Sequence, residues 1–285
     1  MGRLLKRKKW LVPLILYLCI GLWIFWGNSA IECNTFIVDS NRVPEAFEGY
    51  RIAHISDLHN GEMGKENEKL LRLLEASEPD IIAITGDLID SRSTDVGIAL
   101  EFVEKAVKIA PCYYVTGNHE IRVPDAYEQL EAGMKAAGVT ILENATGIID
   151  LQGESLVIAG IADPSAQTDY LTGDEGSVAD RELQAVDLNN DQYTILLSHR
   201  PELLSVYTEH GIDLVLSGHA HGGQFRIPFI GGLIAPNQGF FPQYDAGHYT
   251  KGSTNMIVSR GIGNSLFPFR VNNPPEIILV ELHCA

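Results

Sequence analysis

Cysteine is scarce in this chain of 285 residues, and its placement excludes a cysteine-based framework. There are four cysteines. Cys19 falls in an apolar N-terminal run and Cys284 is next to the last residue, while Cys112 opens an apolar stretch and is expected to be a small buried side chain. No two of them lie at the spacing of metal ligands. We therefore expect neither a disulfide scaffold nor a cysteine-bound structural zinc.

Positive charge is in short supply beyond the N-terminus. The chain has 21 Lys and Arg against 37 Asp and Glu, and five of the basic residues stand in its first nine positions. Everything after Lys9 therefore holds 16 basic and 37 acidic residues, a formal charge of −21. A body this acidic repels polyphosphate backbones, which argues against nucleic-acid binding. No protein partner is predicted either.

Charged residues are absent between Trp10 and Ile31. An apolar run of this length can cross a bilayer as a helix, and tryptophans near its two ends suit the interfaces. Because basic residues stay in the cytoplasm, the following domain should lie beyond the membrane. We expect residues 1–9 to be cytoplasmic, 10–31 to be a signal-anchor and 32–285 to be the catalytic domain. A cleaved signal peptide is the alternative, but Trp23 and Trp26 disfavour cleavage nearby.

Strand-like apolar runs alternate with helical patterns after the anchor, and no internal repeat is visible. This order predicts an α/β fold with a sheet-on-sheet core and helices outside. A pair around Gln152-Gly153 is expected to be antiparallel: Thr146–Leu151 and Leu156–Ile161. The other expected strands are Tyr50–Ser56, Ile81–Thr85, Tyr113–Thr116, Tyr193–Ser198, Leu214–Ser217, Asn255–Ser259 and Glu276–Leu282. The expected helices are Glu66–Ala76, Val96–Val107, Ala126–Ala137 and Pro201–His210.

Five of these strands run into polar blocks rich in potential metal ligands. The blocks are Asp57-Leu58-His59, Gly86-Asp87-Leu88-Ile89-Asp90, Gly117-Asn118-His119-Glu120, His199 and Gly218-His219-Ala220-His221. Since ligands bind outside the carboxyl ends of strands in open sheets, the blocks should converge on one edge. Carboxylate and imidazole ligands suit Mn²⁺, Fe or Zn²⁺. Each block alone has an ordinary explanation as a turn or cap, but their joint occurrence by chance is negligible.

The spacing within the blocks has a physical reason. In an extended Asp57-x-His59 segment both side chains would point to the same side and reach one ion. The same holds for His219-x-His221, whose imidazoles could instead flank two adjacent ions. Glycines precede several ligands, where the backbone must turn tightly near the site. Two ions ~3.5–4 Å apart can hold both the attacking and the leaving oxygen of an in-line displacement.

With these blocks in place, the chain resembles the calcineurin-like metallophosphoesterases from Tyr50 to about Gln224. The resemblance implies a four-layer α/β/β/α sandwich and a dinuclear centre whose hydroxide attacks phosphorus. The implied ligands are Asp57, His59 and His221 on one ion, Asn118, His199 and His219 on the other, and Asp87 between them. His119 would be the general acid, oriented by Asp90. Arg92 could contact phosphate, although the intervening Ser91 argues against the protein serine/threonine phosphatase branch.

Further motifs are similar to a bacterial membrane-associated branch that includes phosphodiesterases and a UDP-2,3-diacylglucosamine pyrophosphatase. They are Tyr50-Arg51-Ile52, Gly222-Gly223-Gln224, Ser259-Arg260-Gly261-Ile262-Gly263 and Pro274-Pro275-Glu276. This resemblance implies hydrolysis of a phosphodiester or pyrophosphate bond in a lipid or cell-envelope substrate. A phosphomonoesterase is the enzymatic alternative. A non-catalytic scaffold is the other class, and the complete ligand set argues against it.

The segment from residue 240 to 269 is rich in aromatic residues. It contains Phe240, Phe241, Tyr244, Tyr249, Phe267 and Phe269. One hypothesis is an apolar lip that takes a lipid chain or touches the bilayer. The favoured interpretation is that these rings pack under a loop, because aromatic side chains are so often buried. Exposure of most of them in one patch would overturn that interpretation.

Overall fold

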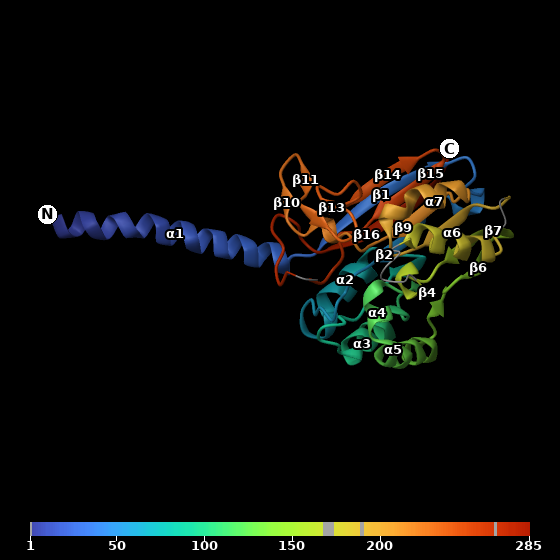
Figure 1. Ribbon diagram of the computed structural model, residues 1–285, viewed down its shortest axis with the longest axis horizontal. Coiled ribbons are helices and arrows are strands. Elements are labelled where there is room, and N and C mark those ends of the chain that lie inside the picture. Colours follow the sequence, from blue (N-terminus) through green and yellow to red (C-terminus); the bar gives the residue numbers. More distant parts are fainter. Residues whose placement is uncertain (1, 168–173, 189–190, 265–266) are drawn as a thin grey trace.

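The apolar runs of the sequence form two six-stranded β-sheets that face each other, with helices on both outer faces. The computed structural model describes residues 2–167, 174–188, 191–264 and 267–285. Figure 1 shows the layered body, from one end of which a single long helix projects. The four-layer α/β/β/α arrangement expected from the sequence is confirmed.

The first sheet has the order β1-β16-β2-β3-β4-β5. Its strands are β1 (Glu32–Ser40), β16 (Glu276–Cys284), β2 (Tyr50–Ile55), β3 (Ile81–Thr85), β4 (Cys112–Val115) and β5 (Thr140–Ile141). Strands β2 to β5 run parallel, whereas β16 is antiparallel to β2 and parallel to β1. The apolar faces of α2 (Glu68–Ala76), α3 (Val96–Ala106) and α5 (Pro124–Ala137) cover its outer side.

The second sheet has the order β14-β15-β9-β8-β7-β6. Its strands are β14 (Gly247–Lys251), β15 (Thr254–Val258), β9 (Leu214–Ser217), β8 (Thr194–Leu197), β7 (Glu154–Gly160) and β6 (Ala145–Leu151). The four central strands are parallel, and the outer strands β14 and β6 are antiparallel to their neighbours. Helices α6 (Glu175–Ala185) and α7 (Leu204–Glu209) pack on the outer face.

The central core lies between the two sheets. Ile52 and Val115 of the first sheet pack in one apolar cluster with Ile158, Ile195 and Leu216 of the second. Cys112 is buried, as expected, and so is His54, whose Nε2 is 2.8 Å from Thr85 Oγ1. The packed core between the two sheets therefore fixes the position of the loops that follow the carboxyl ends of their strands.

The predicted strands and helices agree with the observed ones to within about two residues, except at Pro201–His210. Strand β1 was not predicted, and Val38 is the one buried residue in it. The helix expected at Pro201–His210 is a 3₁₀ turn, Pro201–Leu203, followed by α7. Helix α6 and strand β14 were not predicted. The remaining elements are short: α4 (Asn118–Arg122), β10 (Arg226–Ile227), β11 (Gly231–Gly232), β12 (Ile234–Ala235), β13 (Gly239–Phe240), and 3₁₀ turns at Glu45–Phe47, Lys65–Asn67, Pro164–Ala166 and His221–Gly223.

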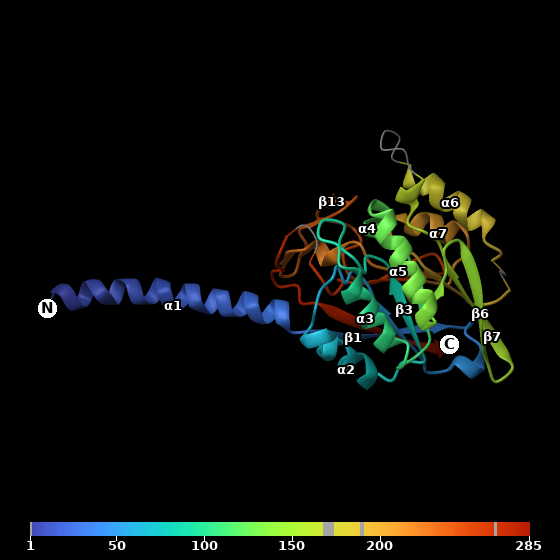
Figure 2. The same cartoon turned by 90° about the horizontal axis from the view of Figure 1, so that it is seen from below.

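Helix α1 (Gly2–Ser29) extends away from the body in both views (Figures 1 and 2). Its segment Val12–Ser29 is long and apolar enough to cross a membrane, and none of that segment is buried in the protein. The helix is nevertheless attached at its end. Asn28 Oδ1 accepts a hydrogen bond of 2.7 Å from the Arg270 backbone N–H, and Asn28 Nδ2 donates one of 2.9 Å to the Arg270 carbonyl.

Truncation of Ile158 tests the face-to-face packing of the sheets. Ile158→Ala removes a fully buried side chain from the central core, and should lower the free energy of unfolding by about 2–5 kcal/mol. Ile148→Ala, on neighbouring β6 where the side chain is 53% exposed, should change it by no more than roughly 0.5 kcal/mol. Urea unfolding of the full chain in detergent, followed by circular dichroism, measures both. Equal losses would contradict the sandwich.

Candidate metal centre

Five loops from both sheets meet at one edge of the sandwich. The loops after β2, β3 and β4 carry Asp57, Asp87 and Asn118, and those after β8 and β9 carry His199 and His219. All five follow the carboxyl ends of parallel strands, the position where open sheets bind ligands. The structure brings every residue of the five blocks that the sequence singled out as a ligand into two neighbouring groups that share Asp87.

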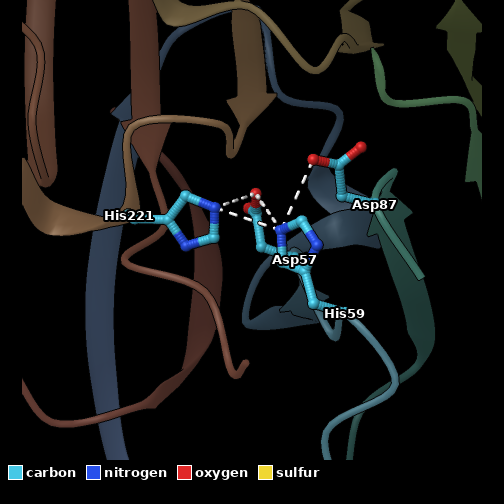
Figure 3. A group of neighbouring side chains, drawn as sticks. All are labelled: Asp57, His59, Asp87 and His221. Carbon is cyan, nitrogen blue, oxygen red and sulfur yellow. Dashed lines mark hydrogen bonds and ion pairs between the residues drawn. The ribbon is translucent and has the colours of Figure 1, made fainter. Parts of the chain in front are cut away.

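The first group consists of Asp57, His59, Asp87 and His221 (Figure 3). His221 Nε2 lies 3.2 Å from Asp57 Oδ1 and 3.1 Å from His59 Nε2. His59 Nε2 is also 3.5 Å from Asp87 Oδ2. All four side chains are buried, so these polar atoms point at one another in a small enclosed space.

The second group consists of Asp87, His199 and His219, with Asn118 beside it. His199 Nε2 is 3.3 Å from Asp87 Oδ2 and 3.2 Å from His219 Nδ1. The amide of Asn118 faces His219 Nδ1, where only the nitrogen end of the amide could form a hydrogen bond, of 2.9 Å. The carboxylate of Asp87 therefore belongs to both groups.

These contacts fit divalent cations. The two Nε2 atoms of His59 and His221 meet at 3.1 Å, and the amide of Asn118 lies 2.9 Å from His219 Nδ1. Asp57 Oδ1 is buried and accepts no regular hydrogen bond from the described residues. A set of carboxylate, imidazole and amide donors arranged in this way is what Mn²⁺, Zn²⁺ or Fe binds.

The buried carboxylates and histidines of the site stabilise each other's charged forms. Burial opposes ionisation of Asp87, but His199 and His59 beside it hold the pKa of that carboxyl well below its usual range. Burial likewise disfavours a charged His199, yet the neighbouring Asp87 raises its pKa to about 10. Protons on histidine thus balance the buried carboxylates, and a divalent ion would replace those protons on binding.

The backbone at the ligands is not extended, which corrects one expectation. Asp57 and His59 have φ angles of 54° and 46°, and His219 and His221 have 64° and 48°. These left-handed conformations are uncommon for residues with a side chain and recur at functional sites. His219 and His221 consequently point into different groups, the second of the two arrangements allowed by their spacing.

Two glycines make room for the ligands. A side chain at Gly218 would overlap Ser56 Oγ and the carboxylate of Asp57, and one at Gly117 would overlap the carboxylate of Asp87. The expected role of these glycines is confirmed. Because the loops pass within contact distance of each other's carboxylates, the backbone itself closes the site.

His119 lies beside the first group, with its ring centroid 4.5 Å from that of His59. Its Nδ1 accepts a hydrogen bond of 3.0 Å from the backbone N–H of Ser91. Asp90 was expected to orient this ring, but Asp90 Oδ1 is 3.7 Å from His119 Nδ1, beyond hydrogen-bond length. Asp90 instead accepts bonds of 3.0 and 2.6 Å from Arg92, which lower its pKa to about 2 in spite of burial.

Glu120 is a positioning residue that the sequence interpretation missed. Its fully buried carboxylate accepts hydrogen bonds from the backbone N–H groups of Asp87 and Gly117, both 2.8 Å, and of Ile89, 3.1 Å. Burial and the charge of Asp87 raise its pKa to about 7. Glu120 thereby ties the loop after β3 to the loop after β4. The sequence feature that could have indicated this role is the position of Glu120 directly after Gly117-Asn118-His119.

Arg200 was also missed. Its buried guanidinium forms two hydrogen bonds with Asp163, of 2.6 and 2.9 Å, and its Nη1 is 3.1 Å from His219 Nε2. The pair lies directly behind the second group. Arg200 follows His199 in the chain, but its partner Asp163 comes from the loop after β7, and this pairing is visible only in the folded protein.

Substitution of Glu120 tests its positioning role. Glu120→Gln places an amide N–H against backbone N–H donors, and should lower the free energy of unfolding by about 1.5–3 kcal/mol and reduce the metal bound per chain. Glu128→Gln, an exposed position on α5, should change neither quantity. Urea unfolding and mass-spectrometric metal analysis measure the two effects. Normal metal content in a fully stable Glu120→Gln variant would contradict the role.

Comparison with known proteins agrees with this geometry. Residues 50–223 match the family described as calcineurin-like phosphoesterase. An uncharacterised metallophosphoesterase of Bacillus subtilis, YkuE, is 31% identical over 88% of this chain and 85% of its own length. The phosphodiesterase YaeI of Escherichia coli is 27% identical over 82% of each chain.

A solved structure shares the fold. The crystal structure of TT1561 of Thermus thermophilus superposes with a TM-score of 0.52 and 16% identity over 75% of this chain and 90% of that one. The family match spans all the loops of the metal centre. The chain therefore belongs to the calcineurin-like phosphoesterase family, and is a hydrolase of phosphoric esters with a centre for two divalent metal ions.

Proposed function

We propose that this protein is a membrane-anchored phosphodiesterase or pyrophosphatase that acts on a lipid or cell-envelope substrate. The observation that carries the proposal is the pair of ligand groups joined through Asp87, with His119 beside them and an apolar pocket next to His221. The pair of groups supports phosphoester hydrolysis, and the pocket supports a substrate with an apolar part.

The proposed ligands follow the two groups. Asp57, His59 and His221 would hold one ion and Asn118, His199 and His219 the other, with Asp87 common to both groups. Bound ions at these positions would supply Lewis acidity and a nucleophile at neutral pH. The protein keeps the donors in place through Glu120 and Arg200, so little reorganisation is needed when ions bind.

His119 is the proposed general acid. The ring donates as the charged imidazolium, whose Nδ1–H faces Ser91 Oγ at 3.2 Å. Its Nε2–H, which is not bonded to Ser91, gives its proton to the leaving oxygen of the ester and leaves a neutral ring. The carboxylate of Asp90, 3.7 Å from Nδ1 and held by Arg92, stabilises the charged ring electrostatically without accepting a hydrogen bond from it.

The pocket next to His221 supports an apolar substrate. It has a volume of about 260 Å³. Its lining is mostly apolar and includes Ala220, His221, Gln224, Ile234, Ala235, Pro236 and Phe267. Since His221 both lines this pocket and belongs to the first ligand group, an alkyl or acyl part of the substrate would lie directly beside the ions.

Helix α1 supports an uncleaved anchor with the catalytic body outside the cytoplasm. In the proposed organisation, residues 1–9 remain cytoplasmic, residues 10–31 span the membrane and residues 32–285 form the catalytic domain. Basic residues cluster in the first nine positions, ahead of the apolar segment of the helix, and the chain after Lys9 is strongly acidic. A glycerophospholipid or cell-wall polymer diester on that side fits this orientation better than a cytoplasmic nucleotide-linked lipid.

Assays of the metal-stripped full chain in detergent test the reaction. Adding Mn²⁺ should restore hydrolysis, and the rate for bis(p-nitrophenyl) phosphate should exceed the rate for the p-nitrophenyl monoester. Asp87→Ala should abolish both metal binding and hydrolysis, since it removes a ligand common to both groups. His119→Ala should keep the metal and slow hydrolysis, by roughly 100-fold for a diester with an alkyl leaving group and by less for the nitrophenyl esters, whose leaving group needs little protonation.

His248→Ala is the matched control, because this exposed histidine on β14 bonds to Asn255 and lies outside both groups. It should retain full activity. Preference for the monoester would replace the proposal with a phosphomonoesterase. A chain that holds two ions but hydrolyses neither ester in any metal would favour a scaffold.

Thiol labelling tests the topology. A membrane-impermeant maleimide should label the exposed Cys33 and Cys284 in intact spheroplasts, and a Cys33→Ser, Cys284→Ser variant should remain unlabelled. Gly2→Cys in that variant should react only after lysis. The opposite labelling pattern would contradict an outside catalytic body. A purified chain that lacks residues 1–30 by mass would show that the anchor is cleaved.

A further inference from the structure

The attachment of α1 to the body leaves no spacer between membrane and enzyme. Segment Val12–Ser29, with 18 residues, spans about 27 Å as a helix, close to the thickness of a hydrocarbon core. Asn28, within the last turn, already forms two hydrogen bonds with the backbone of Arg270. If α1 crosses the bilayer, the end of the body next to Arg270 must lie at the bilayer surface.

That same end carries an exposed apolar rim, which we define as Phe229, Ile230, Phe240 and Phe241. Phe229 is fully exposed, and the other three are 65%, 70% and 60% exposed. They lie in and after the hairpins β10–β11 and β12–β13, which occur at the end of the body from which α1 projects (Figures 1 and 2). The expectation that Phe240 and Phe241 pack under a loop is therefore wrong.

The backbone conformation at two rim positions is unfavourable for a bulky residue, so turn formation does not explain why phenylalanine is found there. Phe229 and Phe241 have φ angles of 68° and 54°. Glycine or asparagine would adopt this left-handed conformation more easily, and a bulky residue there is an outlier. The hairpins thus tolerate local strain while placing large rings in solvent, which has no advantage for a freely soluble body.

The rim is linked to the pocket beside the metal centre through β12, where Ile234 lines the pocket and pairs with Phe240 of β13. Phe225 packs edge-on against Phe267, with ring centroids 5.0 Å apart, and also contacts Phe269. Gln224 donates hydrogen bonds to the carbonyl groups of Phe267 and Phe269. Gln224, Phe267 and His221 line the pocket beside the first ligand group. The loop that contains Phe267 and Phe269 leads directly to Arg270, where α1 is attached.

We propose that the apolar rim inserts into the surface of the bilayer that α1 spans, and that the pocket beside His221 opens at headgroup level. The occupant of the rim is that bilayer, because the helix attachment fixes the rim beside it. The acidic charge of the body provides no attraction to anionic lipids, so burial of the rings supplies the contact. This inference rests on the proposed membrane anchor, and specifies that the substrate phosphate is reached in place among the headgroups.

Fluorescence quenching in nanodiscs tests the insertion independently of catalysis. The full chain, with Cys19, Cys33 and Cys284 changed to Ser, receives a single label at Phe240→Cys or at Phe229→Cys. Each sample contains one chain per phosphatidylcholine nanodisc, with or without a lipid that carries a nitroxide near the headgroup. Ile148→Cys is the matched control, since this exposed position lies on β6 at the other end of the body.

Nitroxide lipid should quench the label at positions 229 and 240 several-fold more than the label at position 148. Equal, weak quenching at all three positions would overturn the inference. Since no hydrolysis is measured, failure of the esterase assays leaves this result interpretable.

Discussion

The negative charge of the buried Asp87 carboxylate must be balanced by the groups around it. Much of the fold holds those groups in place. Asp87 is almost completely buried at the junction of the two ligand groups. Its Oδ1 accepts a 2.8 Å hydrogen bond from the backbone of His119, while Oδ2 faces His59 and His199. An unpaired charge at this depth would be strongly destabilising. The five loops that surround it come from both sheets, so the sandwich and the metal centre depend on each other.

The sequence allowed accurate prediction where both faces of a strand are buried. Strands β3 and β9 have no exposed residue and read as uninterrupted apolar runs, so their limits were predicted to the residue. Strand β1 alternates exposed and partly buried residues at a sheet edge. This pattern predicts a strand only weakly, whereas the apolar run before it predicts a membrane anchor strongly. The hairpins that carry Phe229 and Phe240 have strands of two residues, too short for any periodicity to register.

At the site, the ligand types could be predicted but the chain's path between them could not. Carboxylate, imidazole and glycine at fixed spacings indicated metal chemistry, and all the predicted ligand positions come together. The left-handed turns at Asp57 and His219 depend on loops far away in the sequence that pack against them. Glu120 and Arg200 act through partners 33 and 37 residues away, which spacing within one block cannot reveal.

The pairing of β1 with β16 has a consequence for how the protein matures. Strand β1 follows α1 directly, yet it lies at the sheet edge and pairs along its whole length with the last strand, from Glu32↔Glu276 to Ser40↔Cys284. A nascent chain therefore keeps open strand edges at β1 and β2 until β16 has been synthesised. Long-range pairing of this kind is slow, and exposes the waiting edges to aggregation. The nine residues of β16 thus complete the first sheet, which carries three of the five loops of the metal centre.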